Sequence, residues 1–295
     1  MPQAASNGIE LEYETFGASG DPPLLLVMGL GAQMISWDDE LCEAFADRGF
    51  FVIRFDNRDV GLSTKIDAPD ADVLAAATAA MAGQPVDAPY LLSDMAADAW
   101  GLLDALDIDR AHLIGASMGG MIVQSMAIAR PDRVMSLTSI MSTTGDPDVG
   151  MPHPDVLHVL MEPAPVEREA YIEQSVRNSR AIGSPEHFEE ERARRKAARS
   201  YDRCFHPKGV TNQLLAILAS GSRSAALREL RLPALVIHGD ADPLVDVSGG
   251  ERTAECLAGS ELLILEGMGH DLPTHYWARI VEGVCSLASR AGVET

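Results

Sequence analysis

A serine between two glycines stands at the centre of the stretch HLIGASMGGM, residues 112–121. Ser117 lies where an apolar run ends and a helical pattern begins, with Gly115 and Gly119 two residues to either side. A tight strand-to-helix turn strains the backbone of its central residue, and glycines at these positions relieve the clash that a Cβ would create. The turn exposes the hydroxyl and puts the amide of Met118 at a helix N-terminus, where it can bind an oxyanion. The sequence therefore predicts that Ser117 is the nucleophile of a G-x-S-x-G elbow.

A serine hydroxyl is a weak nucleophile at neutral pH, so it needs a general base, and the base needs an orienting acid. The stretch HGDADPLV carries Asp240 and Asp242 after one apolar run, and EGMGHDLP carries His270 after the next. His238 and His275 are weaker candidates for the base, because His238 ends a strand on the aspartate side and His275 falls inside the last helix. The residues alone thus predict a Ser-Asp-His set and leave the two aspartates as competitors.

Strands and helices must alternate to position these residues. Six apolar runs are typical of strands buried on both faces, at residues 24–28, 50–55, 111–115, 133–141, 233–239 and 261–267. Residues 9–16 alternate between apolar and polar, which predicts a strand with one solvent-exposed face. Helical patterns cover residues 91–106 and begin again at Met118. This alternation predicts an α/β fold with a mostly parallel sheet flanked by helices.

The alternation fails once, from residue 143 to residue 225, where the chain is charged and helix-prone and has no buried-strand pattern. We expect this segment to be a helical cap inserted between the fourth and fifth of the buried strands. The predicted domains are therefore a core, residues 1–142 and 226–295, and a cap, residues 143–225. The charge of the cap is more typical of solvated helix faces than of a binding patch.

Over nearly its whole length the sequence resembles the α/β-hydrolases, and within them the aclacinomycin methylesterase group of bacterial esterases. The resemblance lies in LLLVMGLG, IRFDNRDVGLST, HLIGASMGGMIVQ, PALVIHGDADPLV and GMGHDLP. Two departures stand out. Many relatives have glycine at the position of Asp59. Many also have histidine at the position of Met28, directly before the glycine. Neither departure removes a backbone role.

The resemblance implies a role for each site residue. Asp242 fits the G-x-x-D position of the family and becomes the orienting acid, with His270 as general base. The second oxyanion donor is implied to be the amide of Leu30, beside that of Met118. In similar proteins the loop 56–63 braces the site.

The substrate pocket is expected to lie under the cap. The candidates for its apolar wall are Met28, Met151, Leu157, Leu160 and Met161. No arginine cluster points to a phosphate or carboxylate substrate, so an uncharged ester is favoured.

We therefore expect a serine carboxylesterase that hydrolyses small to medium neutral esters through an acyl-enzyme. The alternatives within this chemistry are a methylesterase of a polycyclic natural product, a lactonase and a cofactor-free perhydrolase. From another class, a ligand-binding receptor on a hydrolase fold would keep a pocket but turn over slowly. Dehalogenase and epoxide-hydrolase chemistry is disfavoured because both need a carboxylate where Ser117 stands.

Composition narrows the partners. The chain has 295 residues and a net charge of −21, which disfavours binding to nucleic acid or to anionic membranes. Its four cysteines form no C-x-x-C pair, so neither a metal site nor a disulfide framework is predicted, and no cofactor is expected. The N-terminal stretch lacks a basic segment followed by an apolar one, so a cytoplasmic enzyme is expected. The sequence does not indicate the oligomeric state.

Overall fold

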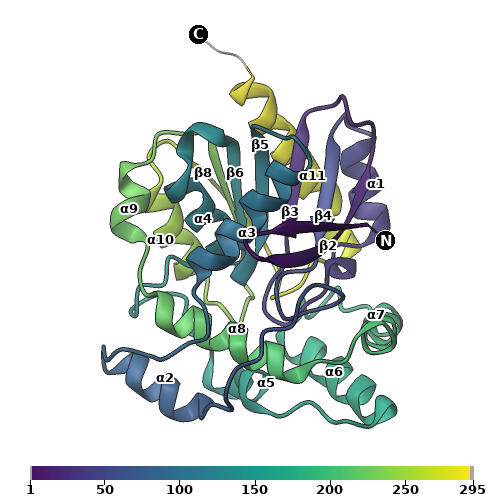
Figure 1. Cartoon of the computed structure of the whole chain (residues 1–295), viewed down its shortest axis with the longest axis vertical. Helices are drawn as coiled ribbons and strands as arrows, with labels where there is room; N and C mark the ends of the chain where they lie inside the picture. Colours follow the sequence, from purple (N-terminus) through teal and green to yellow (C-terminus); the bar gives the residue numbers. More distant parts are fainter. Residues whose placement is uncertain (1, 293–295) are drawn as a thin grey trace.

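One sheet runs through the computed structural model, which describes residues 2–292 (Figure 1). The strands, in chain order, are β1 (Gln3–Ser6), β2 (Ile9–Phe16), β3 (Pro23–Val27), β4 (Phe51–Phe55), β5 (Ala111–Ala116), β6 (Val134–Ile140), β7 (Ala234–Gly239) and β8 (Glu261–Leu265). Their order across the sheet is β1-β2-β4-β3-β5-β6-β7-β8. The pairs β1–β2 and β2–β4 are antiparallel and the remaining pairs are parallel, which confirms the predicted mostly parallel sheet.

The unbroken apolar runs are explained by two hydrophobic cores, one on each face of the sheet. In β3, Leu25 and Val27 belong to one core, whereas Leu24 and Leu26 belong to the other, and all four side chains are fully buried. Because successive side chains of a strand point to opposite faces, a strand covered on both sides needs apolar residues at every position.

Helices cover both faces. They are α1 (Asp39–Ala46), α2 (Val73–Met81), α3 (Leu92–Ala105), α4 (Met118–Ala129), α5 (Leu157–Met161), α6 (Arg168–Ile182), α7 (Glu190–Arg203), α8 (Pro207–Ser220), α9 (Ser224–Glu229), α10 (Ser248–Cys256) and α11 (Thr274–Ala291). Short 3₁₀ turns are η1 (Met34–Ser36), η2 (Pro131–Arg133) and η3 (Pro154–Val156). Helices α3, α4, α9 and α10 contribute to one core, and α1 and α11 to the other. No helix within residues 2–292 is long and apolar enough to cross a bilayer.

The predicted helical insertion between the fourth and fifth buried strands is present as α5 to α9, between β6 and β7. Figure 1 shows α5 to α8 gathered at one end of the sheet, together with α2, which packs against α8. The division into a core and a cap of residues 143–225 stays a proposal. Its second boundary falls inside α9, whose Leu227 is buried in the core.

The sequence did not indicate β1. This strand has only four residues and pairs with β2 at the edge of the sheet. Its Ser6 hydroxyl donates to the carbonyl of Asp98 on α3 at 2.6 Å. A short segment of small and polar residues lacks the alternation that predicts a strand, so its pairing depends on tertiary contacts.

Candidate active site

Ser117 occupies the turn between β5 and α4. Its φ is +57°, in the region that favours glycine, as expected for a strained elbow. A Cβ on Gly115 would lie 2.1 Å from the carbonyl oxygen of Gly119, and one on Gly119 would lie 2.1 Å from the carbonyl oxygen of Val27. The turn therefore closes only with glycine at both positions.

The fold brings Ser117, Asp242 and His270 together from three different loops. Nε2 of His270 lies 2.9 Å from Oγ of Ser117, and Nδ1 lies 2.7 Å from Oδ2 of Asp242. A carboxylate only accepts hydrogen bonds, so Nδ1 carries the proton and Nε2 is free to accept the proton of the serine hydroxyl. The three side chains thus form one hydrogen-bonded chain with the polarity of a nucleophile, a base and an acid.

Asp242 is held as a carboxylate. Burial by itself raises its pKa, but the charge of His270 and hydrogen bonds from His238, His270 and the Val245 amide outweigh burial and hold the pKa below its usual range. Its second oxygen, Oδ1, accepts from the amides of Leu244 and Val245, both at 2.9 Å. These contacts fix the carboxylate for its bond to His270.

The competing candidates lie elsewhere. Asp240 is exposed, and its Oδ1 accepts from the amide of Gly267 at 2.7 Å. The ring of His275 stacks on that of His187, with centroids 3.7 Å apart. His238 is buried, and its Nε2 lies 3.5 Å from Oδ2 of Asp242, whereas the hydrogen bond to Ser117 comes from His270.

The loop after β3 brings Gly29 against the serine. A Cβ on Gly29 would lie 3.0 Å from Cβ of Ser117, so the predicted donor Leu30 follows a residue in contact with the nucleophile. Met118, the other predicted donor, directly follows Ser117 as the first residue of α4 and has a fully buried side chain. Each donor thus comes directly after a residue at the nucleophile: Leu30 follows Gly29, and Met118 follows Ser117. The function of the two amides as an oxyanion hole stays a proposal.

Polar side chains from elsewhere hold this loop. The amide of Gly31 donates to Oε1 of Gln213 on α8 at 2.8 Å, and Nε2 of Gln213 donates to the carbonyl of Arg58 at 2.8 Å. From the loop 56–63, Asn57 donates to the carbonyl of Met28 at 2.9 Å. The sequence did not indicate Gln213, because a single glutamine in a helix has no pattern that distinguishes it from a solvated one.

Asp59, the departure from glycine, also has a positive φ, +73°. Its carboxylate accepts from the hydroxyl of Tyr90 at 2.6 Å, from the Ile66 amide at 2.6 Å and from Asn212 of α8 at 3.1 Å. The side chain thus compensates for the strained backbone by joining the core loop to α8.

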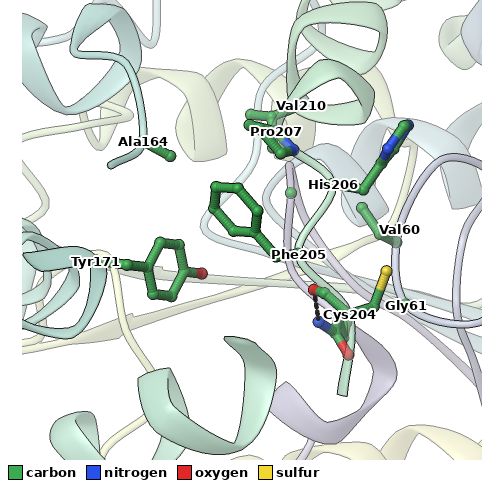
Figure 2. A pocket seen from close by; sticks show the side chains of 11 residues that line it. Val60, Gly61, Ala164, Tyr171, Cys204, Phe205, His206, Pro207 and Val210 are labelled. Atoms are coloured by element: carbon green, nitrogen blue, oxygen red, sulfur yellow. Dashed lines mark hydrogen bonds between the residues drawn. The ribbon is translucent and has the colours of Figure 1, made fainter. Parts of the chain in front are cut away.

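A small cavity of about 50 Å³ lies between this part of the core and the cap (Figure 2). Its walls are Gly31, Gln33, Val60, Gly61, Ala164, Tyr171, Cys204, Phe205, His206, Pro207 and Val210. Tyr171 and Phe205 approach it from different cap segments with rings at 88° and centroids 5.7 Å apart. Gly31 connects the cavity to the loop that contacts Ser117.

The five predicted pocket residues are not among these walls. Met28 is buried in the core, Leu160 is half-buried, and Met151, Leu157 and Met161 are 50%, 44% and 41% exposed. Their part in substrate binding stays a prediction. Tyr171 and Phe205 were not predicted from the sequence. The available signal was that both are aromatic residues within a charged segment.

Within residues 2–292, no three or more His, Cys, Asp or Glu side chains are grouped so that they could hold a metal ion.

Comparisons with known proteins cover nearly the whole chain. A family model described as the alpha/beta hydrolase fold matches residues 22–273. The chain is 29% identical to two relatives named rhodomycin D methylesterase, DauP from Streptomyces sp. strain C5 and DnrP from Streptomyces peucetius, over 97% of this chain and 97% of each relative. It is 25% identical to 3-oxoadipate enol-lactonase 2 of Acinetobacter baylyi, over 88% of this chain and 85% of that protein.

Solved structures agree in fold. The meta-cleavage product hydrolase CumD from Pseudomonas fluorescens IP01 superposes with a TM-score of 0.77 at 18% identity, covering 99% of this chain and 98% of CumD. The esterase RhEst1 from Rhodococcus sp. ECU1013 gives 0.73 at 21% identity, covering 99% of both chains.

Proposed function

Because this chain belongs to the α/β-hydrolase fold family, we propose that it is a serine carboxylesterase that hydrolyses small to medium neutral esters through an acyl-enzyme. Two relatives that it matches over 97% of their length are named methylesterases, and the chain is a carboxylic ester hydrolase. One observation carries the finer proposal: Ser117, His270 and Asp242 form a continuous hydrogen-bonded chain, with contacts of 2.9 Å and 2.7 Å.

Acylation begins when Oγ of Ser117 attacks the ester carbonyl carbon and its proton passes to Nε2 of His270. The carbonyl oxygen becomes an oxyanion, which accepts hydrogen bonds from the amides of Leu30 and Met118. When the tetrahedral intermediate collapses, the bond to the alcohol oxygen breaks, and the alcohol leaves with the proton from His270. The product is an ester of Ser117 with the substrate's acyl group.

Deacylation repeats these steps with water. The water oxygen attacks the acyl carbon while His270 takes a proton from the water. His270 then returns a proton to Oγ of Ser117 as the carboxylic acid leaves. Asp242 stays ionised throughout, keeps the proton on Nδ1 and stabilises the imidazolium in both halves of the cycle. The lowered pKa of Asp242 supports this role.

A second candidate, methylesterase activity on a polycyclic natural product, is favoured by the two full-length relatives named rhodomycin D methylesterase. The mechanism is the same, and methanol is the leaving alcohol. The other possible functions are those of a lactonase, a perhydrolase and a slow-turnover receptor. The cytoplasmic location stays a prediction from the sequence.

The test combines covalent labelling with turnover. A fluorophosphonate is expected to label wild-type protein once, at Ser117, and Ser117→Ala is expected to lose both labelling and esterase activity. Ser125→Ala, on the helix that follows, serves as the control and should keep both. Labelling at another serine would contradict the assignment.

A panel of p-nitrophenyl esters of rising chain length, assayed beside a bulky polycyclic methyl ester, then separates the substrate classes. Multiple turnover on the simple esters supports a general carboxylesterase, and preference for the methyl ester supports the second candidate. A single burst without further turnover would contradict both and indicate a receptor.

A further inference from the structure

The loop that carries His270 is fastened to the cap. This loop, residues 266–273 between β8 and α11, is called here the histidine loop. The amide of His270 donates to the carbonyl of Ile182, the last residue of α6, at 2.6 Å. The amide of Gly269 donates to Oγ of Ser184 at 3.0 Å. Two successive amides, including that of the base itself, thus have acceptors in the cap.

Ser184 is fully buried and joins both sides of this contact. Its hydroxyl and its amide both donate to Oδ1 of Asp271, at 2.6 Å and 3.0 Å. The hydroxyl therefore donates to the residue after His270 and accepts from the residue before it. Burial raises the pKa of Asp271, and the hydrogen bonds from Ser184 oppose that rise.

At Gly183 and Gly269 the backbones of the cap and of the histidine loop are in direct contact. A Cβ on Gly269 would lie 2.4 Å from the carbonyl carbon of Gly183, and one on Gly183 would lie 2.9 Å from Oδ2 of Asp271. Glycine on both sides allows the approach, so the position of the histidine loop is determined by the cap as well as by the sheet.

We propose that Ser184 and Asp271 are positioning residues, which hold His270 in register with Ser117 and Asp242 by fastening the histidine loop to the cap. The inference rests on the proposed function. The imidazole must keep contacts of 2.9 Å and 2.7 Å at the same time, so a small displacement of its backbone weakens both. The cap therefore helps to assemble the catalytic base in addition to covering the site.

Three variants test this proposal on p-nitrophenyl acetate. Ser184→Ala and Asp271→Ala remove the contact from opposite sides, so each remains informative if the other fails to fold. We expect kcat to fall on the order of tenfold or more in both, because misplacing a catalytic group by about 1 Å costs up to about 10²-fold. KM should change by less than about twofold, since neither side chain is proposed to bind substrate.

Asp271→Asn is the conservative variant. Its amide oxygen can still accept from Ser184, so we expect kcat within about threefold of wild type, because the proposed contact needs an acceptor and not a charge. The downfield proton NMR signal of His270 Nδ1–H should persist in Asp271→Asn and weaken in Asp271→Ala. Equal losses in the two Asp271 variants would overturn the proposal.

Asp146→Asn is the matched control. Asp146 also joins cap to core, through an ion pair with Arg252 of α10 at 2.9 Å. Its other partners include Ser222 and Ser224, which lie outside the histidine loop. Its kcat should stay near that of wild type. An equal fall in Asp146→Asn would attribute the effect to general loosening of the cap and overturn the proposal.

The proposed function fails separately from this inference. If wild-type protein neither turns over the ester nor reacts with the phosphonate at Ser117, the proposed function is wrong. If it does both, and Ser184→Ala and Asp271→Ala keep wild-type kcat, only the positioning role is wrong.

Discussion

His238 and His270 both reach Oδ2 of Asp242, His238 through Nε2 at 3.5 Å and His270 through Nδ1 at 2.7 Å. Nε2 of His238 also lies 2.8 Å from the carbonyl of Val245. Both neighbours are acceptors, so Nε2 of His238 carries a proton. Its other nitrogen, Nδ1, is buried without a hydrogen-bond partner among the described residues, and a Cβ on Gly250 would lie 2.5 Å from it. His238 is thus a buried support of the acid, and His270 is the histidine in contact with the nucleophile.

Steady-state kinetics can test whether Asp242 or Asp240 is the acid that orients His270. Asp242→Asn should lower kcat on the order of 10³- to 10⁴-fold, because an amide in this position favours the wrong imidazole tautomer. Asp240→Asn should cost less than about tenfold, since its contact is with the Gly267 amide and an amide oxygen can replace it. Steady-state kinetics on one ester compare the two variants, and a larger loss in Asp240→Asn would reverse the assignment.

We expect Gln213, although it lies on a cap helix, to hold the loop that carries the proposed oxyanion donor Leu30. Gln213→Leu removes the acceptor of the Gly31 amide and the donor to Arg58, and it displaces the loop that carries Leu30. The loss in kcat should approach the cost of one missing oxyanion donor, about 10²–10³-fold.

The neighbouring variant Asn212→Leu provides the comparison for Gln213. Asn212 is equally buried on α8, but its hydrogen bonds go to Asp59 and Ile66. Asn212→Leu should destabilise the protein while kcat of the folded fraction stays within about tenfold of wild type, because no proposed oxyanion donor loses its support. Similar kcat losses in both variants would remove the specific role of Gln213.

We expect the cap residues that line the cavity to determine which ester chain length the enzyme prefers. Phe205→Ala and Tyr171→Ala enlarge the cavity, so the ratio of kcat/KM for long over short esters should rise, by about 10–200-fold per methylene accommodated. The exposed Leu157 lies outside that cavity, and Leu157→Ala should leave the ratio unchanged. A shift in Leu157→Ala alone would return the pocket to the residues first predicted.

Stability should fall in mild acid because of His112. This side chain is 3% exposed at the start of β5, and its Nδ1 lies 2.8 Å from Oγ of Ser136. Burial, aided by the charge of Arg110, lowers the pKa of His112 to about 4. Between the unfolded value of about 6.5 and this folded value, the unfolded chain binds the extra proton, so the free energy of unfolding decreases as pH falls, by at most about 1.4 kcal/mol per pH unit.

Urea unfolding at about pH 7 and about pH 5 checks this effect, because the two values bracket the ordinary histidine pKa. His112→Asn removes the titrating group, and the variant should lose less stability than wild type between the two values. His158→Asn, at an exposed position on α5, should behave as wild type does. An unchanged pH dependence in His112→Asn would contradict the assignment.

The sequence by itself determined the features that depend on local physics. Unbroken apolar runs indicated strands buried on both faces, and the glycines around Ser117 indicated a turn that tolerates no Cβ. The order of Ser117, Asp242 and His270 along the chain was also visible. Each of these signals lies within a few residues, where backbone geometry and side-chain periodicity leave few alternatives.

Tertiary structure decided what depends on contacts between distant segments. The contacts from Ser184 to Asp271 and from Gly31 to Gln213 join residues 87 and 182 positions apart, and no local pattern marks any of the four residues. The cavity walls likewise came from core loops and from separate cap segments. A polar side chain in a charged helix has the same sequence pattern whether it faces water or a catalytic loop, and only the packing of the chain distinguishes the two.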